Sequence, residues 1–346
     1  MNILLFQLDG RQPNMALMRL AHHHRVLGHG VELRRAGNAA ALEPRMGDPI
    51  WDRVYASSIF ESSRPLCERV LQLYPMAELG GTGWVLGKQL EHVGVSSQGP
   101  LDYSDYKVRY SMGFTQRGCR LACEFCVVPK KEGKVKPWST IREIWRGGDH
   151  PKEILLLDND FFGNPDWRAR IAELREGDFK VCFNQGINAR MLNDETAAAI
   201  ASVKFKDDSF SRPRIYTAWD GKKDERTLMR GLEALAAAGV KPNQIMVYML
   251  IGFELGETHA DRDYRRNKLR EFGVRPYPMP HARSGRSRSG AAGEELVAFQ
   301  RWCIQRKDQF VPWSEWWGKA KGNPRKLGDR VTLPLFPDDE HDEDEE

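Results

Sequence analysis

Three cysteines in the middle of the chain have the residue type and the spacing of a metal-binding site. Cys119, Cys123 and Cys126 follow the pattern C-x3-C-x2-C. Cysteine thiolates are the usual protein ligands of iron-sulfur clusters, and close spacing allows one loop to bind several irons. Three thiolates leave one iron of a four-iron cluster open, so that a small molecule can bind it, as at catalytic zinc sites. The spacing therefore favours a catalytic cluster over a structural one.

The other cysteines, Cys67, Cys182 and Cys303, are scattered along the chain. A disulfide framework would spread cysteine pairs through a small secreted domain, so this distribution is more typical of a cytosolic cluster site. The sequence also has no long uncharged apolar run and no signal-peptide pattern. We therefore expect a cytoplasmic protein that does not enter a membrane.

Strand-like runs alternate with helical patterns through the region that contains the cysteines. The expected strands are 108–114, 153–158, 181–184, 214–219, 245–251 and 275–279. Because strands that alternate with helices pair in parallel, six β/α units predict a partial (β/α)6 relative of the TIM barrel. In that architecture the chemistry takes place at the carboxyl ends of the strands. The cysteines follow the first expected strand and therefore lie at that end.

The segment 118–126, GCRLACEFC, resembles the signature loop of the radical S-adenosylmethionine (SAM) superfamily, including the aromatic Phe125 before the last cysteine. The resemblance implies a 4Fe-4S cluster on Cys119, Cys123 and Cys126 whose fourth iron binds the amino and carboxylate groups of SAM. It also implies reductive cleavage of SAM to methionine and a 5′-deoxyadenosyl radical. An electron donor such as flavodoxin or ferredoxin is the implied partner. The resemblance identifies neither the substrate nor the class of the overall reaction.

Other interpretations of the cysteines remain open. They could bind zinc with an unrecognised fourth ligand, hold a cluster that only transfers electrons, or be unrelated thiols. A zinc- or cluster-stabilised nucleic-acid-binding protein is the corresponding function of another class. It would account for the basic character of the chain, which carries 52 Lys and Arg against 40 Asp and Glu once the acidic segment 338–346 is set aside. Such a charge attracts phosphate-rich partners, so a nucleic acid or a modified nucleoside is one candidate substrate.

Residues at the expected strand ends are candidates for the SAM pocket. The segment 249–258, MLIGFELGET, resembles the fifth-strand segment of many family members, in which the apolar run and glycine contact adenine. Its turn is one residue longer here. Ile251 and Gly252 are therefore candidates for adenine contact. Phe125 is included in the pocket because it belongs to the signature loop.

Polar strand-end residues complete the expected pocket. These are Asp158, Asn159, Asp160, Gln185, Arg190 and Asp220. The first three stand where many family members have Gly-Gly-Glu, and their side chains could bind the SAM ammonium. The Arg190 guanidinium could pair with the SAM carboxylate, and Gln185 with a ribose hydroxyl. Ordinary turn chemistry explains the same residues equally well.

The first part of the chain, 1–104, also alternates strands and helices, which predicts a doubly wound α/β domain. Its expected helices are 15–27, 65–74 and 85–93. A doubly wound domain before the barrel resembles the cobalamin-binding radical SAM proteins, and the glycines at 80–83 could allow a nucleotide tail to approach. However, Arg11 stands where the D-x-H-x-x-G pattern has its histidine. Cobalamin, and with it a cobalamin-dependent methyltransferase, is therefore the less favoured alternative to a domain that caps the barrel.

The sequence after the last expected strand predicts two further parts. The expected domains are 1–104, doubly wound; 105–290, radical SAM barrel; 291–337, helical extension; and 338–346, an acidic disordered tail. The extension contains Trp313, Trp316 and Trp317. Together with Arg283, Arg286 and Arg288 these rings could bind RNA. Packing of the tryptophans against the barrel is the favoured prediction.

Overall fold

The computed structural model describes residues 1–281 and 291–320. The chain divides into two compact units, one spanning Met1–Val108 and the other beginning at Arg109. The expected acidic tail, the end of the helical extension and the arginines Arg283, Arg286 and Arg288 lie outside the described residues. Both units are built on parallel sheets with helices, which confirms the predicted α/β class.

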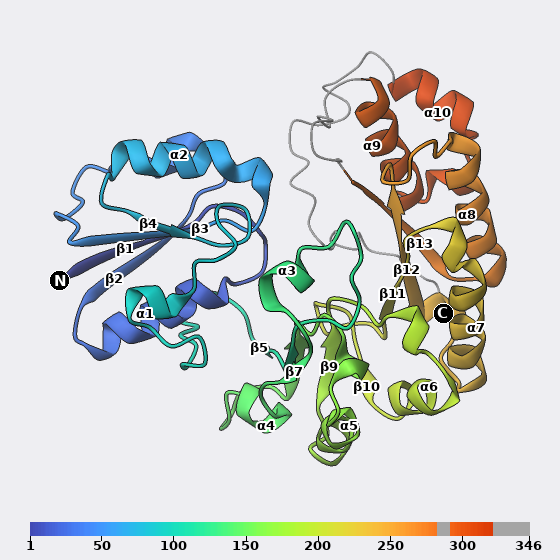
Figure 1. The fold of residues 1–346 in the computed structure, drawn as a ribbon, viewed down its shortest axis with the longest axis horizontal. Coiled ribbons are helices and arrows are strands. Elements are labelled where there is room, and N and C mark those ends of the chain that lie inside the picture. The colour runs from blue at the N-terminus through green and yellow to red at the C-terminus, as the bar shows by residue number, and fades with distance from the viewer. Residues whose placement is uncertain (282–290, 321–346) are drawn as a thin grey trace. The chain divides into compact units, whose positions relative to one another are not determined.

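The first unit is a four-stranded parallel sheet covered by helices on both faces (Figure 1). Its strands run in the order β2 (Gly30–Arg35), β1 (Asn2–Gln7), β3 (Arg53–Ser57), β4 (Glu78–Gly80). Helix α1 (Met15–Val26) packs on the face that presents Ile3 and Leu5. Helix α2 (Arg64–Leu73) packs on the face that presents Leu4 and Phe6. The alternation of buried side chains along β1 explains why helices cover both faces.

The prediction of a helix at 85–93 is wrong. Only the 3-10 turn η3 (Leu90–Val93) forms there, while Val85 and Leu86 are exposed. The amide N–H groups of Trp84 and Val85 both donate to the carbonyl of Gly81, which closes a turn. Glycines around that turn and a β-branched Val85 disfavour a helix, so the apolar spacing was misleading.

The second unit contains two parallel sheets. One has the order β10 (Lys204–Phe205), β9 (Lys180–Phe183), β8 (Glu153–Leu156), β5 (Ser111–Gly113). The other has the order β11 (Ile215–Trp219), β12 (Ile245–Ile251), β13 (Arg275–Pro280). The amide N–H of Ile187, after β9, donates to the carbonyl of Tyr216 in β11 at 2.7 Å. Six strands match the expected ones and β10 is additional, while closure into a partial barrel stays a prediction.

Helices lie along the outer side of these sheets (Figure 1). They are α4 (Ile141–Ile144), α5 (Trp167–Glu176), α6 (Asp194–Ala201), α7 (Glu225–Ala237), α8 (His259–Phe272), α9 (Ala291–Ile304) and α10 (Trp313–Ala320). One apolar core fills the space between helices and strands, with Val181, Ile215 and Val247 from the strands. Since side chains alternate along a strand, Cys182, Tyr216 and Tyr248 face the opposite side. Each strand therefore directs one row of residues away from the helices.

The tryptophans of the extension pack against the second unit, as predicted. The Trp313 ring stacks on His259 of α8, with centroids 4.8 Å apart. The Trp316 indole N–H donates to the carbonyl of Ala298 in α9 at 3.0 Å. Both side chains border the main apolar core. These contacts account for the aromatic residues without a nucleic acid.

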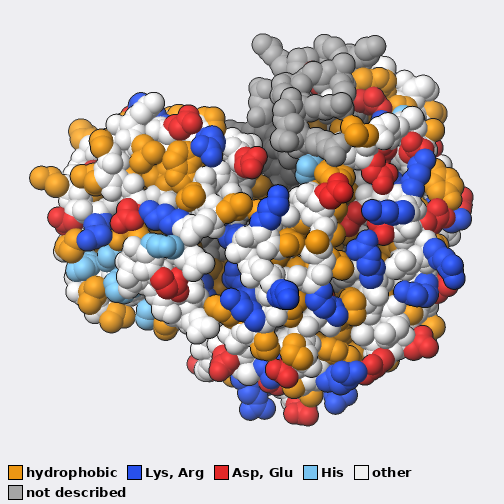
Figure 2. Space-filling model, viewed as in Figure 1, with side chains coloured by type: hydrophobic (Ala, Val, Ile, Leu, Met, Phe, Trp, Pro, Cys, Tyr) orange, Lys and Arg blue, Asp and Glu red, His pale blue; other side chains and the backbone are white. Residues whose placement is uncertain are grey.

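No helix among the described residues is long and apolar enough to cross a bilayer. Charged side chains of both signs are spread over the face shown in Figure 2.

The Asp308 carboxylate joins the segment after α9 to α8. Its side chain is fully buried and accepts hydrogen bonds from Arg266 at 3.0 Å and from Arg270 at 3.0 and 3.1 Å. Asp308→Asn keeps the shape but leaves Arg270 without this counter-charge and Arg266 with Asp263 alone. Because breaking a buried ion pair costs about 3–5 kcal/mol, we expect the free energy of unfolding in urea to fall by about 3 kcal/mol.

A surface ion pair provides the control for this prediction. Glu315 pairs with Lys319 at 2.6 Å, and both side chains are more than half exposed. Glu315→Gln should therefore change the unfolding free energy by less than about 1 kcal/mol. Equal effects of the two substitutions would contradict the role assigned to Asp308.

Candidate functional site

The cysteine loop is closed at its base by backbone contacts. It lies between β6 (Gln116–Arg117) and α3 (Val128–Glu132), and β6 pairs with β7 (Lys136–Pro137). The amide N–H of Cys119 donates to the carbonyl of Gly133 at 3.2 Å, and that of Gly118 donates to the Glu132 carboxylate at 3.0 Å.

Gly118 is required at the first turn of this loop. Its φ is +81°, and a Cβ there would lie 2.2 Å from the carbonyl oxygen of Lys134. Residues other than glycine rarely adopt a backbone conformation with this φ, and this position also has no space for a side chain. The loop can therefore close only with glycine before Cys119.

A buried carboxylate at the end of β8 holds the cysteine loop from the other side. Asp160 accepts two hydrogen bonds from the Arg120 guanidinium, at 2.7 and 2.9 Å, and the amide N–H of Arg120 at 3.3 Å. The Asp160 side chain is 2% exposed. Arg120, whose role sequence reasoning missed, thus fixes the loop to the sheet by a bidentate ion pair. Asp160, expected to bind SAM, has its carboxylate engaged in this contact.

Asp158 anchors the chain just before the loop. Its carboxylate accepts the amide N–H of Thr115 at 2.7 Å, the amide N–H of Gln116 at 3.3 Å and the Thr115 hydroxyl. Burial raises the pKa of Asp158 to about 7, although these donors oppose the shift. Asn159, between the two acids, is half-buried, and its side chain makes no hydrogen bond to a described residue. Of the three candidates after β8, Asn159 is therefore the one with a side chain still open to a ligand.

The three thiols lie within electrostatic range of one another. Burial raises the pKa of Cys119, and the neighbouring Cys126 and Cys123 raise it further; burial and Cys123 do the same for Cys126. All three side chains are partly exposed and none is in a disulfide. Positive iron would reverse this mutual repulsion by favouring the thiolates.

This donor set fits a cluster that takes one thiolate for each of three irons. Among the described residues, no group of three or more His, Cys, Asp or Glu side chains is arranged to hold a single metal ion.

Arg190 lies beside the second cysteine. It pairs with Asp224 at 2.8 Å. Burial alone would lower its pKa, but Asp224 and the Cys123 thiol raise the pKa above its ordinary value. The structure thus brings this predicted cation to the cysteine loop.

Asp220 follows β11 and is half-buried. Burial raises its pKa to about 6, nearby Asp224 adds to the shift, and Arg190 and Arg265 oppose it. The negative charge of Asp220 also contributes to the raised pKa of the Cys126 thiol. Asp220 and Arg190 therefore place opposite charges near the thiols. Gln185, after β9, is exposed, and its side chain forms no hydrogen bond with a described residue.

The end of β12 is shaped by a buried ion pair that sequence reasoning missed. Glu257 accepts the amide N–H of Gly252 at 2.6 Å and pairs with Arg265. Arg265, 1% exposed, also donates to the carbonyls of Trp219 at 3.2 Å and Leu250 at 2.9 Å. This network joins the ends of β11 and β12. Glu257 in GFELGET and an arginine eight residues later, within α8, were the available signal.

The two adenine candidates differ in accessibility. Ile251 is fully buried in the apolar core. Gly252 has a φ of +77°. The Phe125 ring of the cysteine loop meets Phe253, next to Gly252, at a centroid distance of 5.4 Å. The signature aromatic residue and the β12 turn therefore lie side by side.

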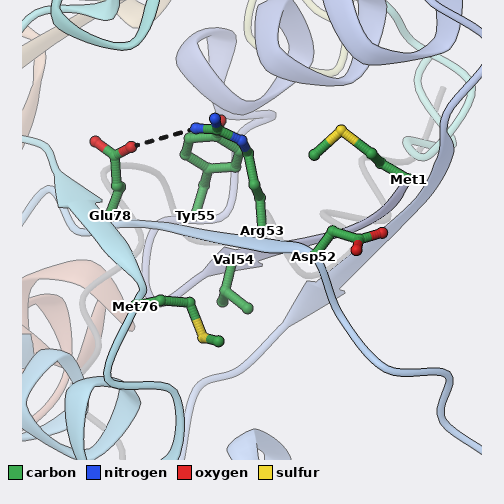
Figure 3. A pocket seen from close by; sticks show the side chains of 7 residues that line it. All are labelled: Met1, Asp52, Arg53, Val54, Tyr55, Met76 and Glu78. Carbon is green, nitrogen blue, oxygen red and sulfur yellow. Dashed lines mark ion pairs between the residues drawn. The ribbon is translucent and has the colours of Figure 1, made fainter.

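A separate hollow of about 340 Å³ lies in the first unit, at the edge of the sheet where its strands begin (Figure 3). Arg53 and Glu78, which pair at 3.8 Å, start β3 and β4 on its wall. Ligands of open α/β sheets bind at the opposite, carboxyl edge. This hollow is therefore not a candidate for the cofactor site.

Comparison with known proteins identifies a similar fold. No family model matches the chain, and no curated protein sequence matches it. Among solved structures, it is similar to the apo, SeMet-labeled cobalamin-dependent S-adenosylmethionine radical enzyme OxsB, with a TM-score of 0.51 and 12% identity. The similarity covers 88% of this chain and 56% of that one, so the chain spans about half the length of its neighbour. At this identity the comparison shows the fold alone.

Proposed function

We propose that this protein is a radical SAM enzyme in which Cys119, Cys123 and Cys126 hold a 4Fe-4S cluster. One observation carries the proposal: three partly exposed thiols with the C-x3-C-x2-C spacing lie on a loop fixed to the ends of parallel strands. Similarity of fold to a SAM radical enzyme supports it. When bound, the cluster supplies one electron for reductive cleavage of SAM to methionine and a 5′-deoxyadenosyl radical.

The residues around the thiols have distinct roles in this proposal. The Arg190 guanidinium binds the SAM carboxylate, and the Asp220 carboxylate binds the ammonium, since both lie near the cysteines. Asn159 and Gln185, whose side chains are open, supply hydrogen bonds to the amino acid or ribose part. Asp158 and Asp160 act as positioning residues because their carboxylates already hold the loop.

In this proposal adenine binds at the aromatic residues Phe125 and Phe253 and at Gly252. Phe125 and Phe253 offer ring surface next to the β12 turn. Gly252 fits that turn because a Cβ there would lie 2.4 Å from the Leu296 side chain, so only its backbone is offered to the base. Ile251 supports this turn from the core side, because its side chain is buried and its carbonyl accepts the amide N–H of His281 at 2.9 Å. The substrate that receives the radical stays open.

The test is anaerobic reconstitution followed by turnover. We expect about four irons and four acid-labile sulfides per chain, and formation of 5′-deoxyadenosine from SAM after reduction with dithionite. Chromatography of the products measures the cleavage. Bound zinc without acid-labile sulfide would contradict the proposal and favour a structural metal site.

A cobalamin-dependent methyltransferase is the second candidate. The observation in its favour is that the similarity to a cobalamin-dependent enzyme covers 88% of the chain and so includes part of the first unit. Cobalamin absorbance retained after gel filtration would support it.

The glycine-rich turn of the first unit does not add to the case for cobalamin. A Cβ on Gly81 would lie 2.1 Å from the carbonyl oxygen of Ser58, and one on Gly83 would lie 2.3 Å from that of Phe60. Contact with the protein's own backbone therefore explains these glycines without a nucleotide.

A further inference from the structure

A lysine-rich segment, residues 127–138, follows the cysteine loop directly. Lys130, Lys131, Lys134 and Lys136 are all exposed. Figure 2 shows Lys and Arg side chains gathered on the face near α3, which belongs to this segment. Within the described residues, Lys130, Lys134 and Lys136 form no ion pair. The segment therefore presents a concentrated positive charge to solvent.

The one acidic residue of the lysine-rich segment is already neutralised. Glu132 accepts hydrogen bonds from the Arg117 guanidinium at 2.6 and 3.0 Å and from the amide N–H of Gly118. Its side chain is 10% exposed. The positive field of the lysines is thus not cancelled within the segment, and it can attract an anionic partner from a distance.

This segment is held against the cysteine loop at both ends. Its first residue, Val127, directly follows Cys126. Further along, the carbonyl of Gly133 accepts the amide N–H of Cys119 at 3.2 Å. Lys136 of β7 lies opposite Arg117 of β6 in the antiparallel strand pair. A partner bound to the lysines therefore sits next to the proposed cluster ligands.

We propose that the lysine-rich segment is the docking surface for an acidic one-electron donor protein that reduces the cluster. This inference rests on the proposed function, because only a cluster enzyme needs that electron. In the transfer the donor loses one electron and the cluster gains one, and no bond forms or breaks. Redox encounters use small interfaces and gain speed from opposite charges, so a short charged segment is sufficient.

The aromatic residues near the lysines favour a protein partner over single-stranded nucleic acid. Base stacking needs an aromatic face that is open. The Trp138 ring has the Arg117 guanidinium at 5.8 Å and the Lys136 ammonium at 5.5 Å from its centroid. The Phe114 ring is covered by the same guanidinium at 4.0 Å. Cationic side chains of the protein itself thus lie over the ring faces on which a base would stack.

The experiment compares two electron sources with the cluster-loaded protein. The variant Lys130→Glu/Lys131→Glu/Lys134→Glu reverses the charge and leaves Lys136, which contacts Trp138, unchanged. With flavodoxin hydroquinone, we expect the rate of cluster reduction in stopped-flow absorbance to fall at least about tenfold. With dithionite, the rate should stay within about threefold of wild type, because a small reductant needs no docking surface. Calorimetry should show weaker flavodoxin binding.

Two controls accompany the charge-reversal variant. The triple variant Lys152→Glu/Lys204→Glu/Lys241→Glu changes three exposed lysines elsewhere in the second unit and should keep the flavodoxin rate. In wild-type protein, raising the salt from about 50 to about 500 mM should slow flavodoxin far more than dithionite, because salt screens the many surface charges of a protein partner. The salt series keeps the inference testable even if the charge-reversal variant folds poorly.

The possible results separate the docking surface from the proposed function. An unchanged flavodoxin rate overturns the docking surface, and so does an equal loss with both reductants, which would mean damage to the loop. Weaker binding of single-stranded RNA with an unchanged flavodoxin rate would assign the lysines to nucleic acid instead. If dithionite reduces no cluster in wild-type protein, the proposed function itself fails.

Discussion

Alanine in place of Cys119, Cys123 or Cys126 is expected to abolish the cleavage of SAM. In the proposed site each thiol binds one iron, so its loss opens a second corner of the cluster. Outer residues around metal sites typically contribute 10–100-fold, and loss of a direct ligand should exceed about 100-fold. Iron and sulfide content after reconstitution and the yield of 5′-deoxyadenosine measure the effect.

The remaining cysteines provide matched controls for these variants. Cys67, Cys182 and Cys303 are buried and do not belong to the cysteine loop. Cys67 and Cys303 are part of apolar cores, and Cys182 lies in β9. Alanine at each should leave the iron content and SAM cleavage near the wild-type values, with a modest loss of thermal stability from the smaller side chain. If a Cys123→Ala protein keeps its iron and its turnover, the ligand assignment is refuted.

Gly118→Ala is expected to lower cluster loading by at least about tenfold while the rest of the protein stays folded. The added methyl would lie 2.2 Å from the carbonyl oxygen of Lys134, and φ at +81° adds strain. The loop must then open, which moves Cys119 away from the other two cysteines. Absorbance of the reconstituted cluster reports the loading, and circular dichroism reports the fold.

Gly147→Ala separates crowding from backbone strain. Gly147 has a similar φ of +76°, but nothing lies within 4 Å of the position that its Cβ would take. This variant should therefore load its cluster far better than Gly118→Ala. Equal loading of the two proteins would show that the close contact with Lys134 does not control the loop.

The sequence predicted those parts of the fold that depend on local patterns. Strand β12 spans Ile245–Ile251, as expected, because its apolar run is continuous and ends at Gly252. The cysteine spacing is also local, and so its place after the first strand of the second unit could be read directly. Two-residue β10 has no such pattern and was missed.

Contacts between distant residues could not be predicted in the same way. Asp160 and Arg120 are 40 residues apart, and nothing in either neighbourhood indicates the pairing. Both acids after β8 were expected to face a ligand, whereas their carboxylates bind groups in and before the cysteine loop. A strand end with Asp and Asn suits both uses, so the choice depends on which donors the fold brings near.

The cysteine loop owes its shape to contacts that involve no thiol. Gly118, Glu132 and the Arg120–Asp160 ion pair hold it through the backbone and through side chains outside the ligand set. Little conformational entropy then remains to be lost when metal arrives. If the proposed cluster is lost in air, the loop should therefore keep its shape, so that the protein stays folded and fresh iron and sulfide are enough to restore the site.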